Sequence, residues 1–151
     1  MTLLRRRDER GSLAPAVPVI AMALLLLGGL TIDASRQLNA RGQAVAFAEE
    51  AARAGAQGVD ISADELELDQ AMARERVEAY CAEVERLGQV RECSFVGIEE
   101  VGGGDPRPLV VVTEVRLAIK SSLLGMVGVR ELTASSTARA RPYEGITEPI
   151  D

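Results

Sequence analysis

The residues that most often carry out acid–base or nucleophilic chemistry are few in this 151-residue chain, and histidine is absent. Without histidine the serine pairs at 121–122 and 135–136 lack the usual general base that would activate them. The adjacent Glu99 and Glu100 would point to opposite faces of a strand. The glycines at 102–104 have no following lysine or helix that would make a phosphate loop. We therefore predict that the protein is not an enzyme and takes no cofactor and no small-molecule substrate.

An acidic stretch, DISADELELD at residues 60–69, is dense enough in carboxylates to raise the question of calcium. Its spacing does not follow the D-x-D-x-D-G loop, and it contains no glycine for the sharp turn that such a loop needs. Acidic side chains are also favoured at the start of a helix, where they interact with the helix dipole. We therefore predict a helix N-terminus after this stretch and no metal site.

Two cysteines, Cys81 and Cys93, are the only thiols of the chain. Their spacing is not that of a C-x-x-C redox motif. If the domain lies outside the cytoplasm, an even pair is expected to be oxidised, which would stabilise the fold by about 2–4 kcal/mol. We predict a Cys81–Cys93 disulfide; the alternative is two buried thiols in a small core.

The element that positions everything else is an uncharged run of 21 residues from Ser12 to Ile32. As a helix it would be about 30 Å long, which is the thickness of a hydrocarbon core. No A-x-A cleavage site follows the run, because Asp33 stands where a small residue would be needed. We expect an uncleaved transmembrane helix; a cleaved signal peptide with its apolar region at 21–30 is the alternative.

Charge is divided unevenly around this run. Residues 1–32 carry a net charge of +2, and the remainder carries −8. Basic residues stay on the cytoplasmic side of a membrane, so the N-terminus is expected there and the C-terminal domain outside. The overall charge of −6 and the 3% of aromatic residues argue against nucleic acid as a partner.

The helical pattern continues beyond Asp33 as far as residue 59. The residues expected on one face of this stalk are Ala34, Leu38, Arg41, Val45, Ala48, Ala52, Gly55 and Val59. Most of this face is alanine or glycine, so it is suited to close packing against a sheet or another helix. Gly28 and Gly29 form a further small patch that would let a neighbouring helix approach.

The outer domain is predicted to combine a second helix with an antiparallel sheet. The helix is expected at 70–88 and the strands at 90–101, 108–119 and 132–141, where hydrophobic residues alternate. Between the last two strands, SSLLGMVGV at 121–129 makes an apolar loop. This loop either docks on a partner, dips toward the membrane surface, or closes the end of the sheet.

The N-terminal segment resembles the TadE/TadG-like proteins of the tight-adherence (Flp, type IVb) pilus system. The resemblance covers about the first 60 residues. It rests on Arg10-Gly11-Ser12, Gly29-Leu30, Asp33, Arg36, Arg41 and the alanine-rich AEEAARAGA at 48–56. It implies a membrane-anchored, pseudopilin-like component of pilus assembly or secretion, with other pilus subunits and the lipid bilayer as partners.

The resemblance also points to Gly11 and Ser12 as a possible processing site. Prepilin-type sites have glutamate at the fifth position after the glycine, where this chain has Ala16. The expected role is therefore that of an assembly component rather than a filament subunit.

The expected architecture is an α+β, pilin-like fold in which a long helix lies on a small antiparallel sheet. The expected segments are a cytoplasmic leader (1–11), a transmembrane helix (12–32), a helical stalk (33–59), an extracytoplasmic domain (60–142) and a flexible tail (143–151). Two other functions remain open: an anchored extracellular protein-binding module unrelated to pili, and a soluble protein secreted after signal cleavage.

Overall fold

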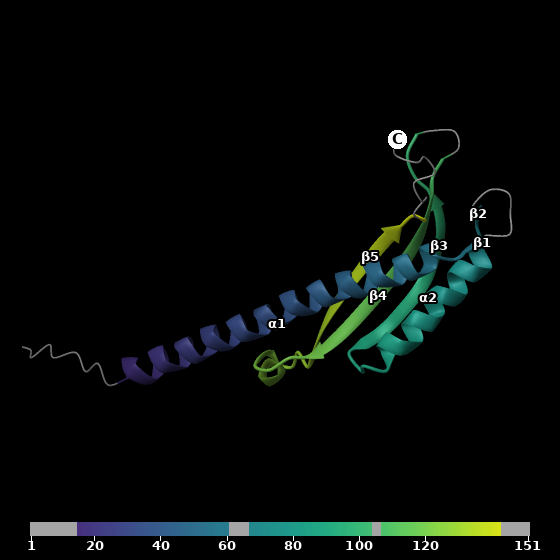
Figure 1. Cartoon of the computed structure of the whole chain (residues 1–151). Helices are drawn as coiled ribbons and strands as arrows, with labels where there is room; N and C mark the ends of the chain where they lie inside the picture. The colour runs from purple at the N-terminus through teal and green to yellow at the C-terminus, as the bar shows by residue number, and fades with distance from the viewer. Residues whose placement is uncertain (1–14, 61–66, 104–106, 143–151) are drawn as a thin grey trace, which may run out of the picture.

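The chain is organised around one long helix, α1, which runs from Ala16 to Ala56 without a break. The computed structural model describes residues 15–60, 67–103 and 107–142. The N-terminal half of α1 projects away from the rest of the molecule, and its C-terminal half packs on a sheet to form the head (Figure 1). Pro15 and Pro18 lie at the start of the helix, where a missing N–H is tolerated.

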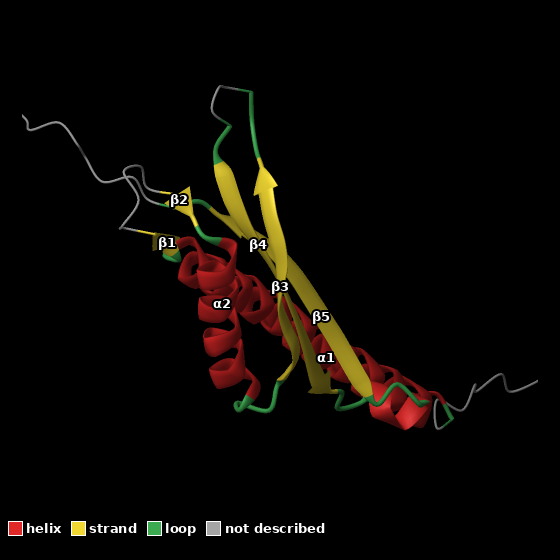
Figure 2. Cartoon of the chain, turned by 90° about the vertical axis from the view of Figure 1, so that its right-hand side faces the viewer, coloured by secondary structure: helices red, strands yellow, loops and turns green. Residues whose placement is uncertain are grey.

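Three long strands form the antiparallel sheet of the head, in the order β3-β4-β5. They are β3 (Val90–Glu100), β4 (Leu109–Lys120) and β5 (Glu131–Ala140). The helices cover one face of this sheet (Figure 2). The expected α+β architecture, a long N-terminal helix packed on a small antiparallel sheet, is therefore confirmed.

A second helix, α2 (Gln70–Glu85), lies beside α1 and ends three residues before the predicted limit. Asp69 caps its N-terminus, because the Asp69 carboxylate accepts a hydrogen bond of 2.8 Å from the amide of Met72. A two-residue pair, β1 (Val59–Asp60) and β2 (Glu67–Leu68), joins the two helices. The prediction that an acid of residues 60–69 serves a helix start is confirmed for Asp69.

The core lies between α1 and the sheet and consists mainly of small residues on the helix side. Four alanines spaced four apart on α1 are buried against large aliphatic residues of β4 and small ones of β5. These alanines are Ala40, Ala44, Ala48 and Ala52. The buried Thr113 hydroxyl donates a hydrogen bond of 2.8 Å to the carbonyl of Ala48, which ties β4 to the same helix face.

The predicted packing face of the stalk is correct in its C-terminal half and wrong in its N-terminal half. Ala48, Ala52 and Gly55 are buried, but Leu38 is 72% exposed and Val45 is 39% exposed. The buried face is rotated toward Ala40 and Ala44. The reason is steric, because only side chains as small as alanine let the helix axis approach the sheet this closely.

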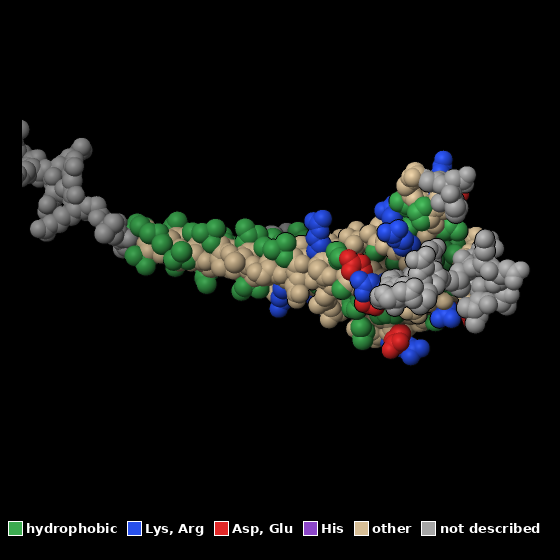
Figure 3. All heavy atoms as spheres, turned by 45° about the horizontal axis from the view of Figure 1, so that its top comes forward, with side chains coloured by type: hydrophobic (Ala, Val, Ile, Leu, Met, Phe, Trp, Pro, Cys, Tyr) green, Lys and Arg blue, Asp and Glu red, His purple; other side chains and the backbone are tan. Residues whose placement is uncertain are grey.

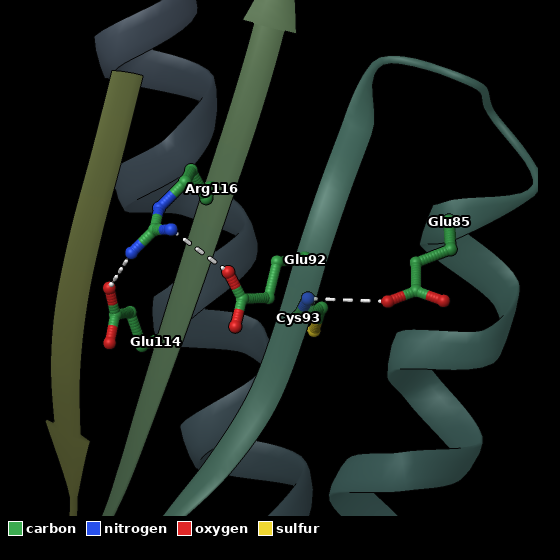
Figure 4. A network of polar contacts seen from close by, with 5 residues as sticks. All are labelled: Glu85, Glu92, Cys93, Glu114 and Arg116. Carbon is green, nitrogen blue, oxygen red and sulfur yellow. Dashed lines mark hydrogen bonds and ion pairs between the residues drawn. The ribbon is translucent and has the colours of Figure 1, made fainter. Parts of the chain in front are cut away.

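The predicted disulfide between Cys81 and Cys93 is present and joins α2 to β3. Its Cα atoms are 5.3 Å apart, a normal separation for such a bridge. On the same link, the carboxylate of Glu85 accepts a hydrogen bond of 3.2 Å from the amide of Cys93 (Figure 4). The second helix is therefore held to the edge strand by a covalent bond as well as by packing.

The exposed side of the sheet carries ion pairs. Arg116 of β4 contacts Glu92 of β3 and Glu114 of its own strand, each at 3.1 Å (Figure 4). Arg139 of β5 contacts Glu99 of β3 at 3.0 Å. These side chains are about half exposed, so each pair contributes roughly 0–1 kcal/mol.

Candidate functional site

The end of the head nearest the projecting half of α1 is held by one carboxylate, that of Asp33. This side chain is only 1% exposed. Its Oδ1 accepts a hydrogen bond of 2.7 Å from the amide of Ser122, and its Oδ2 accepts bonds of 2.9 and 2.8 Å from the amides of Leu123 and Leu124. We call this arrangement the Asp33 clamp. It joins residues 89 to 91 positions apart in the chain.

The three amides are free to donate because of the local fold after β4. They precede or begin the short 3₁₀ helix η1 (Leu124–Val127), and the first amides of a helix have no partner within it. Asp33 accepts from all three. The loop that contains η1 is therefore attached to α1 through its backbone.

The clamp also sets the ionisation of Asp33, which is the first residue after the apolar run. Hydrogen bonds from the amides of Leu124 and Ser122 hold the pKa of Asp33 below its ordinary value of 3.8. The amide of Leu123 and the charge of Arg36 lower the pKa further, while burial opposes them. Asp33 is consequently a carboxylate at neutral pH, with its charge spread over three N–H donors.

Gly29 completes the contact one helical turn before Asp33. It is buried, and a Cβ placed on it would overlap the side chain of Leu123. Leu123 therefore lies directly on the helix backbone, in the space left by the missing side chain. The neighbouring Gly28 is exposed, and a Cβ there would meet nothing within 4 Å.

Two further residues of α1 contact the same end of the sheet. The guanidinium of Arg36 donates a hydrogen bond of 2.5 Å to the hydroxyl of Ser122, and the amide of Gln37 donates one of 2.7 Å to the carbonyl of Thr133. Arg41 is exposed on the surface of α1. The possible processing site, Gly11 and Ser12, lies outside the described residues.

A shallow groove of about 360 Å³ lies next to the clamp, between α1 and the end of β4. Its lining is mixed polar and apolar and includes two cationic side chains, Arg36 and Lys120. The other lining residues are Asn39, Ala40, Gln43, Gln89 and Ile119. No three His, Cys, Asp or Glu side chains lie together as a metal site in the part of the chain that the structure describes.

Of these residues, the sequence indicated Gly29, Asp33 and Arg36 but not their partners. Gln37, Ser122 and Thr133 carry no local signal, because their roles depend on how the loop and β5 lie against α1. A carboxylate at the border of an apolar run must find donors, since an unpaired buried charge is costly. That argument predicts that Asp33 has partners, but it cannot say which ones.

The fold and the site together define a class of protein: a small α+β head carried on a long helix whose projecting half is apolar. Among the described residues, α1 is the helix long and apolar enough to cross a membrane. Residues 11–58 match a family model described as "Putative Flp pilus-assembly TadE/G-like", so the resemblance predicted from the sequence is confirmed over this segment. No curated protein and no solved structure matches the chain significantly.

The matched segment is about a third of the chain and corresponds closely to α1. It includes Gly29, Asp33 and Arg36, which form the helix side of the clamp. It does not include the loop at 121–130 that these residues hold. The match supports involvement in Flp pilus assembly. It does not cover the loop and the sheet of the head, which are described by the structure alone.

Proposed function

We propose that this chain is a membrane-anchored, pseudopilin-like component that helps to assemble a Flp-type pilus or a related secretion machine. The family match over residues 11–58 supports the pilus role. The long apolar helix supports anchoring in a membrane through residues 12–32. The protein would act by packing against other subunits rather than by catalysis.

The proposed orientation places the N-terminus in the cytoplasm and the head outside. The arginines before the apolar run support this orientation, because basic residues are retained on the cytoplasmic side. The Cys81–Cys93 bridge supports it independently, since structural disulfides persist mainly in oxidising compartments. Cleavage after Gly11 is a further proposal within this role.

The observation that carries the proposed function is an apolar stripe on α1 that the head leaves uncovered. Leu24, Leu38 and Val45 are exposed at 65%, 72% and 39% and lie on one side of the helix at multiples of seven residues, with the polar Thr31 at the position between the first two. Hydrophobic residues at this period form the seam between packed helices. Figure 3 shows hydrophobic side chains along the whole projecting part of α1, with charged ones appearing toward the head.

Part of the stripe lies beyond the proposed membrane segment, where lipid cannot cover it. Leu38 and Val45 are six and thirteen residues past Ile32, so they stand about 9 and 20 Å outside the apolar run. Gly42 lies between them and is exposed, which leaves room for another backbone to come close. A helix of a neighbouring pilus subunit would suit this surface.

The test is to place a charge on the stripe in a strain that makes the pilus. With Leu38→Asp, we expect the number of surface pili to fall strongly while the membrane-bound level of the protein is unchanged. Ser135→Asp, on the exposed side of β5 opposite Arg116, is the matched control and should leave piliation intact. Normal piliation with Leu38→Asp would contradict packing through this stripe. Normal piliation in a strain that lacks the whole chain would contradict the pilus role itself.

A further inference from the structure

We infer that the loop from Ser121 to Arg130 is a second membrane-contact element, which lies in the headgroup region of the bilayer beside α1 and inserts Met126. This inference rests on the proposed anchoring of residues 12–32. Its partner is a lipid surface, and it gives the head a fixed position above the membrane.

The first argument is the depth at which the loop is attached. Leu123 lies on Gly29, three residues inside the end of the apolar run and therefore about 4–5 Å below it. The Asp33 clamp then holds the amides of Ser122 to Leu124 at the border of the run. With α1 in a bilayer, these contacts bring the loop to the boundary between headgroups and acyl chains, where interfacial segments reside.

The second argument is the composition of the loop. Residues 121–129 carry no charge, and the side chain of Met126 is 82% exposed, although it is large and apolar. Val129 is 43% exposed on the same loop. If the loop served only to close the end of the hydrophobic core, these apolar side chains would be buried. Here they face outward and have no covering surface among the described residues, other than the bilayer that α1 would bring to them.

The third argument is the backbone. A segment that enters an apolar layer must satisfy its N–H and C=O groups internally, because lipid offers no partners. Besides the three amides bound by Asp33, the amide of Ser121 donates to the carbonyl of Arg130 and that of Val129 donates to the carbonyl of Leu124, at 3.1 and 3.0 Å. The amide of Met126 donates to the carbonyl of Leu123 at 3.0 Å. The cost of bringing this loop to the apolar boundary is thereby reduced.

The fourth argument is the charge at the edges of the loop. Lys120 and Arg130 flank it, and both are exposed. Lys120 also lines the groove with Arg36, so three cations lie around the base of the apolar loop. Basic side chains beside an interfacial segment are attracted to anionic headgroups, while their aliphatic stems can lie along the acyl border. Lipid therefore matches this surface better than an apolar protein groove would.

The absence of tryptophan from the chain allows a direct test. Met126→Trp puts a single tryptophan at the tip of the loop, in the full-length protein reconstituted into vesicles of phosphatidylcholine and phosphatidylglycerol. Lipids brominated at shallow or deep acyl positions quench tryptophan according to its depth. We expect quenching by the shallow bromines and an emission maximum shifted to shorter wavelength. Val129→Trp gives a second reporter if the first variant folds poorly.

Two matched variants calibrate the result. Leu25→Trp lies in the middle of the apolar run and should be quenched by the deep bromines. Val96→Trp is a water-exposed control, because Val96 lies at the level of Ala48 on α1. Its neighbour Gly97 pairs with Val112 of β4, and the next residue of β4, Thr113, bonds to the carbonyl of Ala48. Ala48 lies fifteen residues, or about 22 Å, beyond Asp33. Shallow quenching should be about threefold or more stronger for Met126→Trp than for Val96→Trp.

The outcomes separate this inference from the anchoring on which it rests. If Leu25→Trp is quenched while Met126→Trp behaves like Val96→Trp, the loop does not touch lipid and the inference is overturned, although the anchor stands. If Leu25→Trp is not quenched either, the anchoring itself fails. Replacing Lys120 and Arg130 by glutamine should weaken the quenching of Met126→Trp in vesicles that contain phosphatidylglycerol and change it less in pure phosphatidylcholine.

Discussion

At the scale of single residues, Asp33 links the apolar N-terminal half of α1 to the head. A buried carboxylate is costly unless donors surround it, and here three backbone amides do so. The donors come from a loop far away in the sequence. The angle and depth of the head relative to α1 therefore depend on this one side chain and on the missing side chain of Gly29.

Removing the carboxylate should release the loop without unfolding the head. In Asp33→Ala, we expect amide exchange at Ser122 to Leu124 to become about tenfold or more faster, because their acceptors are lost. The amides of the central strand β4 should stay protected. Hydrogen exchange of the detergent-solubilised chain, followed by mass spectrometry or NMR, measures both regions.

Asp69→Ala is the control for this experiment, since Asp69 also accepts from a backbone amide, that of Met72. It should loosen the start of α2 and leave the loop at 121–130 unchanged. If the amides of Ser122 to Leu124 exchange as slowly in Asp33→Ala as in the unsubstituted chain, the Asp33 clamp is not what holds the loop.

The clamp should also be insensitive to pH over the physiological range. The pKa of Asp33 is lowered in the fold from its ordinary value of 3.8, so its stabilising contribution is fully present above that value. It is lost as the pH falls below 3.8 through the pKa of the folded state. Titration of the Asp33 carboxyl carbon by NMR in micelles should give a midpoint below 3.8, and a midpoint at or above 3.8 would contradict the hydrogen-bonded carboxylate.

At the scale of elements, α1 shows that a helix face is selected by the size of its side chains more than by their hydrophobicity. Leu38 and Val45 of the predicted face are left outside, whereas the alanines at 40, 44, 48 and 52 are buried. Gly55 is an extreme case, because a Cβ there would lie 2.7 Å from Val77 of α2 and 2.8 Å from Val111 of β4. Gly42 on the same helix meets nothing within 4 Å.

The two glycines therefore predict opposite results for the same substitution. Gly42→Ala should stabilise the chain by up to about 1 kcal/mol, because alanine is the better helix former. Gly55→Ala should destabilise it by about 1–3 kcal/mol, because two packed valines would have to move. Thermal unfolding followed by circular dichroism in one detergent compares them. Equal shifts for both variants would refute the close packing of α1, α2 and β4.

At the scale of the whole molecule, the disulfide joins the helical layer to the edge of the sheet and also reports on the compartment of the head. Replacing Cys81 and Cys93 together by alanine should lower the free energy of unfolding by about 2–4 kcal/mol. Chemical or thermal unfolding of the full chain, with and without reductant, measures this loss. Reductant should have no effect on the double variant, which serves as the control.

The redox state in cells tests the proposed topology. If the head lies outside the cytoplasm, its two cysteines are oxidised in cells. A thiol-reactive polymer added to denatured cell extract should then label the unsubstituted chain only after reduction. Free thiols in unreduced extract would place the head in a reducing compartment and would contradict the proposed orientation.

The sequence by itself determined the local elements of this protein. Four local patterns were enough to predict the elements and the α+β class. They are the uncharged run up to Ile32, the helical spacing after Asp33, the alternating residues of β4 and β5, and the pair of cysteines. The helix and strand signals can be read from the sequence because they depend on residues only a few positions apart, through helix and strand periodicity, and the disulfide followed from there being only two cysteines. They also carried the resemblance over the segment that forms α1.

Only the tertiary structure decided which face of α1 is covered and what Asp33 binds. Leu38 and Ala40 both fit a helical face, and the choice between them depends on how closely a sheet that begins fifty residues after Ala40 can approach. The partners of Asp33 are backbone amides, which every residue except proline possesses, so no side-chain pattern could identify them. These contacts follow from steric fit and from the need to satisfy a buried charge, and both act only once the chain has folded.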